Sequence, residues 1–197
     1  QLLSDFNIDF DLGRWMKVAA ANLPLEASEQ NLKACAEFIT GRQRNNLIEQ
    51  GYRYDVVDAV LAEQQNNPAG ALRAVKELSD WVARENWNII LPAYARCVRI
   101  TRDQKETCTV DPQRFENPSE KALYEELLRV EGSQRKKGSI AAVLEAFLPM
   151  IPAVNAFFDS VLVMAEDERV RNNRLGLLQR IAALTAGAAD LSRLEGF

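Results

Sequence analysis

The sequence predicts an all-α protein, a multi-helix bundle, from three observations. Apolar residues recur with the three- and four-residue spacing of one helix face, and no strand-like alternation persists anywhere in the 197 residues. Hydrophobic residues make up 47% of the chain and charged residues 26%, with only 9 Gly and 7 Pro, as in an ordered globular protein. The stretch from Ile140 to Ile181 is apolar on several sides at its start, so we expect it to form the core.

Five helices are predicted in the first half of the chain, each bounded by a helix start or stop signal. They run from Asp9 or Asp11 to Leu23, from Ser28 to Gln50, from Asp55 to Gln64, from Pro68 to Arg84 and from Asn86 to Thr101. The buried stripe of the second helix is predicted to begin with Leu32, Cys35, Phe38 and Ile39. Because its neighbours are apolar, Cys35 is interpreted as a core residue. Asp55 is predicted to cap the third helix.

A break in the helical pattern separates two parts of the chain. Residues 107–117, TCTVDPQRFEN, combine Thr, Val and an Asp-Pro pair and form the longest stretch without helical periodicity. We therefore predict an N-terminal helical subdomain over 1–106, a linker over 107–117 and a second helical domain over 118–197. Asn117, Pro118 and Glu120 restart the helix as its cap, first residue and third residue, a variant of the capping box.

The predicted core helix extends from Ser139 to Ala165. We expect it to bend near Pro149 and Pro152, because each proline removes an amide donor and crowds the preceding turn. Polar residues and these prolines leave no apolar run of about 18 residues, so a membrane span is not predicted. A tight turn at Glu166 and Asp167 is expected to lead into a second helix.

That second helix carries a charged residue inside its apolar stripe. Asp167 is predicted as its N-cap, with Arg171 four residues later, and Arg174 falls among the buried positions. A guanidinium in such a place needs a partner. We predict that Arg174 pairs with Asp159 on the preceding helix, with Glu166 as the alternative, and that the pair is a clasp between two helices.

Composition excludes several kinds of site. The chain has no histidine, so Ser-His-Asp, Cys-His and histidine metal sites are absent. Neither of the familiar glycine-rich phosphate loops occurs. The cysteines are Cys35, Cys97 and Cys108, odd in number and without a C-x-x-C pair, which indicates a cytoplasmic location. We expect no catalytic residue and no metal. The first residue, Gln1, suggests a part cut from a longer protein.

The run FFDSVLVMAEDERVRNNRLGLLQRI, residues 157–181, resembles the DALR-type helical anticodon-binding domain shared by arginyl-type synthetases and the beta subunit of bacterial glycyl-tRNA synthetase. The matched motif includes Asp167, Arg171, Asn173 and Arg174, which we interpret, together with Asp159, as structural residues. The upstream run from Glu37 to Ala62 is similar to the glycyl beta subunit specifically. The chain is therefore identified as resembling the C-terminal region of that subunit.

The resemblance implies a function in protein synthesis. In that family the enzyme ligates glycine to its tRNA, the alpha subunit supplies the glycine and ATP site, and the beta subunit recognises the tRNA. We therefore expect tRNA for glycine and a synthetase alpha subunit as partners, in a heterotetramer. ATP is used by the whole enzyme and no cofactor is expected in this part of it.

Cations for an RNA backbone are concentrated in two places. Arg96, Arg99 and Arg102 lie along one side of a predicted helix, and Arg135, Lys136 and Lys137 form a basic loop. Trp87, Phe115 and Tyr124 are candidate stacking residues, and Asn172 and Asn173 are candidate base readers. The alternative interpretation of each charged row is an ordinary solvated surface, and that of Asn173 is a bond to backbone. The net charge of −4 does not exclude a local basic patch.

Two other functions remain open from the sequence. One is the anticodon-binding part of an arginyl-type synthetase, which would differ in the tRNA that binds. The other is a non-catalytic helical scaffold that binds a partner protein and is indifferent to tRNA.

Overall fold

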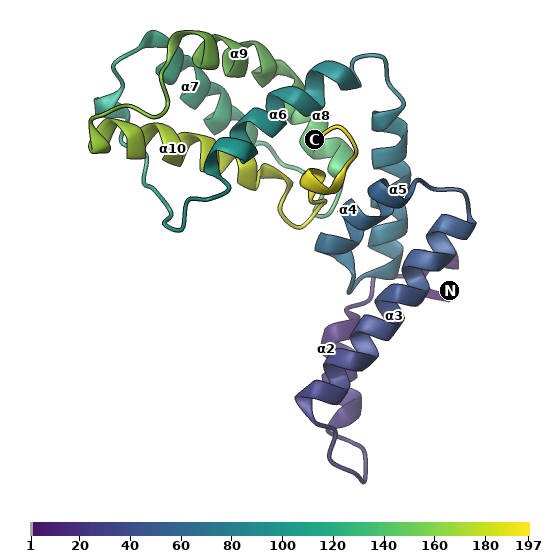
Figure 1. Ribbon diagram of the computed structural model, residues 1–197. Coiled ribbons are helices and arrows are strands. Elements are labelled where there is room, and N and C mark those ends of the chain that lie inside the picture. The colour runs from purple at the N-terminus through teal and green to yellow at the C-terminus, as the bar shows by residue number, and fades with distance from the viewer. Residues whose placement is uncertain (1) are drawn as a thin grey trace. The chain divides into compact units, whose positions relative to one another are not determined.

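The computed structural model describes residues 2–197, and every regular element in that range is helical (Figure 1). The lack of β-strands among these residues confirms the all-α prediction. The packing divides the chain into two compact units. The α-helices are α1 Leu2–Asp5, α2 Leu12–Ala20, α3 Glu29–Glu49, α4 Tyr54–Gln64, α5 Pro68–Val82, α6 Trp87–Thr101, α7 Pro118–Gly132, α8 Ile140–Phe147, α9 Ile151–Ser160 and α10 Glu168–Ala182. Short 3-10 helices are η1 Pro112–Arg114, η2 Leu148–Met150, η3 Ala183–Thr185 and η4 Leu191–Arg193.

The first unit comprises the chain up to Val82 together with residues 137–140 and 187–195. Its core lies between α4 and α5, where helical spacing places apolar residues of both helices out of contact with water. The buried Gln64 at the end of α4 donates from Nε2 to the carbonyls of Gly138 and Ala188, at 2.8 Å each. These two bonds hold both returning segments against α4.

The buried stripe predicted for the second helix is wrong. Ser28 caps this helix, since its Oγ accepts from the Asn31 amide at 3.2 Å, but Leu47 alone is buried along the helix. Phe38 is 69% exposed and Cys35 is also exposed, so Cys35 is not a core residue. Most of α3 runs beyond α4 with only the short α2 beside it (Figure 1). Its apolar residues follow helical spacing, but little chain is there to cover them.

The prediction that Asp55 caps the third helix is wrong. That helix begins at Tyr54, and its N-cap is Arg53. The Asp55 carboxylate is buried, and it accepts from Arg53 Nη2 at 2.6 Å and from the amides of Val56 and Glu195, both at 3.0 Å. Burial acts to raise the pKa of Asp55, but the bonds from Glu195, Arg53 and Val56 outweigh it and hold that pKa below its ordinary value.

The second unit comprises residues 83–136, 141–186 and 196–197. Its α10 packs against α6 and α7, and α9 packs against the same two helices, so four helices share one core (Figure 1). The side chains at the centre are at most 2% exposed and are large, which makes their burial the main stabilising contribution. They include Leu123, Leu127, Phe147, Phe157 and Leu177.

The bend predicted in the core helix is confirmed, because the 3-10 turn η2, which contains Pro149, separates α8 from α9. The helix ends at Ser160, however, and not at Ala165 as predicted. Val161 has extended backbone angles, φ −122° and ψ 124°. From there the side chains alternate, with Val161 and Val163 buried and Leu162 and Met164 exposed. The expected tight turn is therefore an extended connection.

Among the described residues, Ile140–Ser160 is the one helical stretch that is long and apolar enough to cross a membrane by length and composition. The core helix of a soluble protein meets the same test. In this structure α9 packs against α6 and α7, and Val154 and Phe157 are fully buried there. Its apolar character is accounted for by this packing.

The division between the units does not coincide with the boundary predicted at residues 107–117. The chain passes from the first unit to the second between Val82 and Ala83, so α6 belongs with the helices that follow the loop. The loop itself lies within the second unit. The reason is that α6 packs most extensively against α10, which is far from it in sequence.

Candidate nucleic-acid interface

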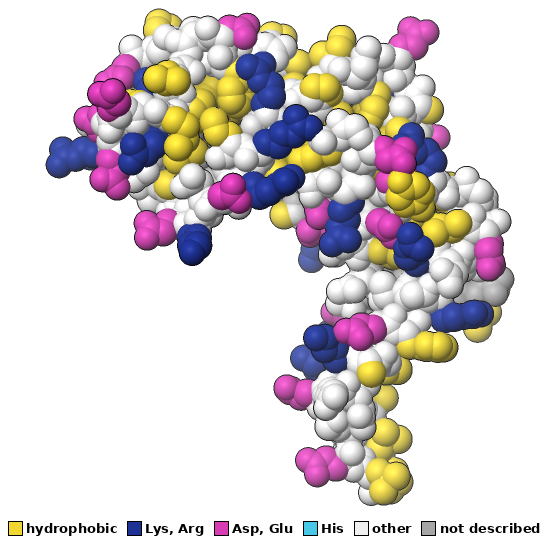
Figure 2. Space-filling view, in the orientation of Figure 1, with side chains coloured by type: hydrophobic (Ala, Val, Ile, Leu, Met, Phe, Trp, Pro, Cys, Tyr) yellow, Lys and Arg dark blue, Asp and Glu magenta, His cyan; other side chains and the backbone are white. Residues whose placement is uncertain are grey.

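Exposed arginines line α6, as the sequence predicted. Arg96, Arg99 and Arg102 are all exposed, and Figure 2 shows Lys and Arg side chains beside hydrophobic ones over this helix. The guanidinium carbon of Arg96 lies 4.3 Å from the centre of the Phe158 ring, and that of Arg99 lies 5.5 Å from the centre of the Phe197 ring. Both guanidinium groups thus lie against aromatic rings, at the distance of a cation–π contact.

The basic loop after α7 is less uniform than predicted. Lys136 and Lys137 are exposed, but Arg135 is half-buried and its Nη1 is buried without a hydrogen-bond partner among the described residues. The loop also spans a division in the fold, since Lys136 belongs to the second unit and Lys137 to the first.

Two of the predicted stacking residues pack against each other. The Phe115 and Tyr124 rings lie 5.4 Å apart between centres, and the Arg180 guanidinium lies 5.3 Å from the Tyr124 centre. Arg180 also pairs with Glu131, which raises the pKa of Arg180. The third predicted stacking residue, Trp87, is half-buried at the start of α6.

Sequence reasoning missed the rings that support the α6 arginines, Phe158 and Phe197. The position of Phe158 follows the helical spacing of core residues, so the sequence gives no sign of its contact with an arginine. That it lies under Arg96 depends on how α9 packs against α6, which no local pattern indicates.

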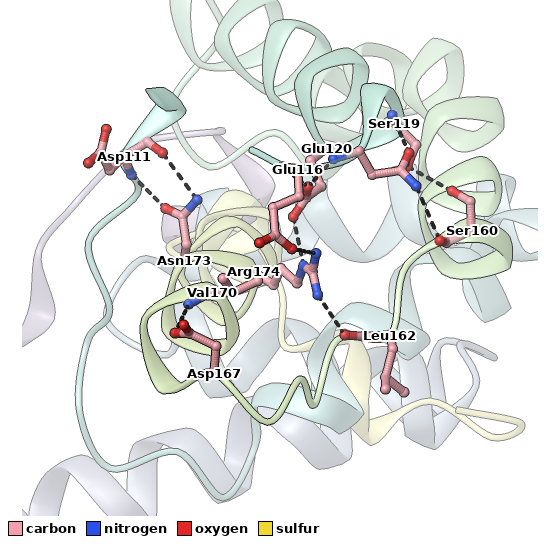
Figure 3. Close-up of polar contacts among 11 residues, drawn as sticks. Asp111, Glu116, Ser119, Glu120, Ser160, Leu162, Asp167, Val170, Asn173 and Arg174 are labelled. Atoms are coloured by element: carbon pink, nitrogen blue, oxygen red, sulfur yellow. Dashed lines mark hydrogen bonds and ion pairs between the residues drawn. The ribbon is translucent and has the colours of Figure 1, made fainter. Parts of the chain in front are cut away.

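Arg174 is paired, as expected for a charge in an apolar stripe, but the partner predicted for it is wrong. Its Nε donates to Glu120 Oε1 at 2.7 Å and its Nη2 donates to Glu116 Oε2 at 3.0 Å. A third bond, 3.0 Å long, runs from Nη1 to the Leu162 carbonyl (Figure 3). Asp159 is exposed and makes no such pair. Tertiary packing brings the start of α7 to α10, so proximity in sequence was the wrong guide.

Glu120 has two functions in this cluster. Its Oε2 accepts from the amides of Glu116 and Asn117 at 2.7 Å each, while Oδ1 of Asn117 accepts from the Ser119 amide at 3.0 Å. These bonds complete the capping box predicted for α7. The other carboxylate oxygen receives Arg174, so one buried carboxylate joins α7, the segment before it and α10. The Arg174 guanidinium is fully engaged in these bonds and is not free to bind RNA.

The start of α10 is organised by Asp167, which is confirmed as its N-cap. The carboxylate accepts from the amides of Arg169 at 2.7 Å and Val170 at 3.2 Å. The bond from Val170 and then that from Arg169 lower the pKa of Asp167. Arg171 reaches back to the Ala165 carbonyl at 2.9 Å, so both residues fix the connection between α9 and α10.

Side chains of α10 hold the loop before α7 along the helix. Asn173 Oδ1 accepts from the Asp111 amide at 2.6 Å, and its Nδ2 donates to the Asp111 carbonyl at 3.1 Å (Figure 3). Two turns later Gln179 accepts from the Cys108 amide and donates to the Glu106 carbonyl, both at 2.8 Å. The backbone interpretation of Asn173 is therefore the correct one, although the bonded backbone belongs to a distant loop.

Between this loop and α10 lies a cleft of about 370 Å³. Asp111 is engaged there, since its carboxylate accepts from the Gln113 amide and from Arg114 Nε at 3.1 Å. The Asn172 and Arg169 side chains are exposed, and their polar groups make no hydrogen bond or ion pair with another described residue. Other lining residues include Glu106, Thr107 and Thr109. Asn172 was a sequence candidate, whereas the cleft gained Arg114 and Arg169 only through folding.

Comparison with known proteins gives a family match that covers most of the second unit. The DALR anticodon binding domain family matches residues 90–191. The sequence is 34% identical to the glycine–tRNA ligase, chloroplastic/mitochondrial 2, of Arabidopsis thaliana over 195 residues. The aligned region covers 98% of this chain and 18% of the Arabidopsis protein. The sequence is also 34% identical over 87% of the chain to a glycine–tRNA ligase beta subunit of Moorella thermoacetica, and 35% identical over 81% to that of Anaeromyxobacter dehalogenans. The chain spans 25% and 23% of the lengths of those two subunits.

Proposed function

The chain belongs to the DALR anticodon-binding domain family, and on that basis we propose that it recognises the anticodon arm of glycine tRNA for a glycine–tRNA ligase. The observation that carries the proposal is the family match over the unit in which α6 presents its arginines. The identity to beta subunits favours the glycine enzyme over an arginyl-type synthetase.

The α6 surface is suited to an unpaired loop of RNA. Guanidinium groups bind phosphates and can also stack on bases, and an unstacked anticodon presents both. Because Phe158 and Phe197 already restrict Arg96 and Arg99, less side-chain entropy would be lost on binding. Arg102, exposed at the end of the same helix, extends the row. Lys136 and Lys137 would add charge from the basic loop, with Arg135 contributing less because it is half-buried.

The test is a salt titration of tRNA binding. Wild-type protein should bind glycine tRNA more tightly than an anticodon-swapped version, with an affinity that falls as salt rises. Replacing Arg96, Arg99 and Arg102 by Ala should lower the slope of log affinity against log salt by about 0.7 for each phosphate that is no longer neutralised. Replacing Arg135, Lys136 and Lys137 by Ala should lower it less.

A matched control replaces three exposed cations of the first unit, Lys17, Arg42 and Lys76, by Ala. This control changes the net charge by the same amount, so a general charge effect would lower its slope equally. An equal slope in the α6 variant and the wild type would remove α6 from the interface. Equal affinity for both tRNAs would contradict anticodon recognition and favour the scaffold alternative, and a preference for arginine tRNA would favour the arginyl alternative.

The remaining partners follow from homology to the beta subunit. We propose that the whole protein works in the cytoplasm with an alpha subunit, which would provide the glycine and ATP site. Support for the alpha subunit comes from the bacterial relatives that are named as beta subunits. Co-purification of the full-length protein with an alpha subunit of the same organism would test this.

A further inference from the structure

The cleft beside α10 is shaped by fixed backbone. Asn173 and Gln179, on one face of the helix, hold the loop at Asp111 and at Cys108, with bonds of 2.6 to 3.1 Å. Between them, Gly176 lets the loop approach, because a Cβ at this position would lie 2.7 Å from the Cys108 carbonyl oxygen. The cleft wall is therefore set by the native backbone before any ligand arrives, which lowers the entropy lost on binding.

The polar groups left over in the cleft are of three different kinds. Glu106 offers only acceptors, Arg169 offers only donors, and the Asn172 amide offers both. The Glu106 carbonyl is bonded to Gln179, but its exposed carboxylate has no hydrogen-bond partner among the described residues. Because residues that carry donors and residues that carry acceptors line one cleft of about 370 Å³, within the range of small-ligand sites, the cleft suits a planar group with a mixed edge.

Resting on the proposed function, we propose that this cleft receives one unstacked anticodon base and that Asn172 and Glu106 read it as cytosine. Cytosine presents an amine donor beside acceptor atoms. The acceptor-only carboxylate of Glu106 would select the amine, and the Asn172 amide would bond the neighbouring edge. Uracil has nearly the same size, but it presents an acceptor where cytosine presents the amine, and it would face Glu106 unfavourably.

The cations of the cleft have a different function from these two residues. Arg169 would contact a phosphate beside the base. Arg114 bonds to Asp111 through Nε, and its remaining donors would contact the phosphate on the other side. Phosphate contacts increase affinity for every sequence, whereas contacts to the base edge create a preference. Within the cleft, the arginines would thus set the affinity for RNA, and Asn172 and Glu106 would set the preference for one base.

Glycine anticodons end in two cytosines, and the experiment compares glycine tRNA with versions in which each of these cytosines is replaced singly by uracil. Wild-type protein should discriminate against at least one replacement by roughly tenfold, the value expected for one good pair of hydrogen bonds. Asn172→Ala and Glu106→Gln should each reduce that ratio below about threefold at the same position, with the salt slope unchanged. Arg169→Gln should instead weaken binding of all versions alike.

Asn45→Ala is the matched control, since it removes an exposed amide on α3, in the first unit and outside the cleft. It should keep the wild-type ratio. The inference is overturned if Asn172→Ala and Glu106→Gln also keep that ratio, or if they weaken every tRNA equally. Absence of any anticodon preference in the wild-type protein would instead overturn the proposed function itself, so the two failures are distinguishable.

Discussion

Arg174 is stable inside the second unit because three acceptors surround its guanidinium. Its side chain is 9% exposed and that of Glu120 is 1% exposed. If one of the two is removed, water therefore does not reach the other to hydrate its charge. A buried pair is itself weak evidence of net stabilisation, since both ions lose their hydration. The effect of the Arg174–Glu120 pair is to fix the relative positions of α7, the segment before it and α10, because these two residues connect all three.

Replacement of Arg174 by Ala should cost about 3–5 kcal/mol of unfolding free energy, because it leaves the Glu120 carboxylate buried without its cation. Urea denaturation of the parent and the variant measures the difference. Arg171→Ala is the control, since Arg171 bonds only to backbone carbonyls and should cost less. The double variant Arg174→Ala/Glu120→Ala should cost less than the sum of the single changes. Additive costs would contradict coupling between the two residues.

Gly176 and Gly41 should respond in opposite directions to the same change. Ala at position 176 would bring a Cβ within 2.7 Å of the Cys108 carbonyl oxygen, so we expect a loss of about 1–3 kcal/mol in unfolding free energy. A Cβ at position 41 meets nothing within 4 Å, so Gly41→Ala should stabilise α3 by up to about 1 kcal/mol. Denaturation monitored by circular dichroism tests both, and a stabilised Gly176→Ala would show that the loop is not held tightly.

The starts of α7 and α10 are determined locally, whereas the positions of the segments around them are determined by distant contacts. Asn117 and Asp167 cap α7 and α10 with bonds that span two or three residues. The loop before α7 is instead placed by Asn173 and Gln179, more than sixty residues away. Polar side chains on α10 therefore hold the backbone of this loop in place, and the loop and the helix together form the two sides of the cleft.

In the first unit, acidification should weaken the attachment of the C-terminal segment to α4. Folding lowers the pKa of Asp55, so its contribution to stability is present above its unfolded pKa of about 3.9 and is lost as pH falls through the folded value. Asp55→Asn should reduce stability near pH 7 and flatten its decline below pH 4. Denaturation midpoints from pH 7 to 2 measure this, with Asp80→Asn as the control for one lost negative charge. Parallel curves for Asp55→Asn and the parent would contradict the assignment.

The whole chain combines an apolar, closely packed second unit with a first unit that exposes much of its apolar surface. Leu25 is 78% exposed and Phe38 is 69% exposed, whereas the exposed large hydrophobic residues of the second unit are Ile89, Leu128, Leu162 and Met164. The DALR match falls mainly on the second unit. Recognition of RNA is accordingly proposed for that unit.

At the scale of the whole molecule, we expect this chain alone to bind tRNA without charging it. The sequence has no histidine and no phosphate loop, and it spans about a quarter of the bacterial beta subunits that it matches. Glycine-dependent pyrophosphate exchange and aminoacylation by the purified chain measure this, with the complete enzyme as the positive control. Charging activity in the chain alone would contradict the proposed division of labour.

The sequence by itself determined the helical class, the caps at Asn117 and Asp167, and the exposure of the α6 arginines. These features depend on residues within a few positions of one another, and helical spacing and capping are local effects. Tertiary structure alone decided that Arg174 pairs with Glu120, that Phe158 supports Arg96, and that the loop of Asp111 lies along α10. Those contacts join residues more than fifty positions apart, and no local pattern encodes which of several free carboxylates, rings or amides a fold will bring together.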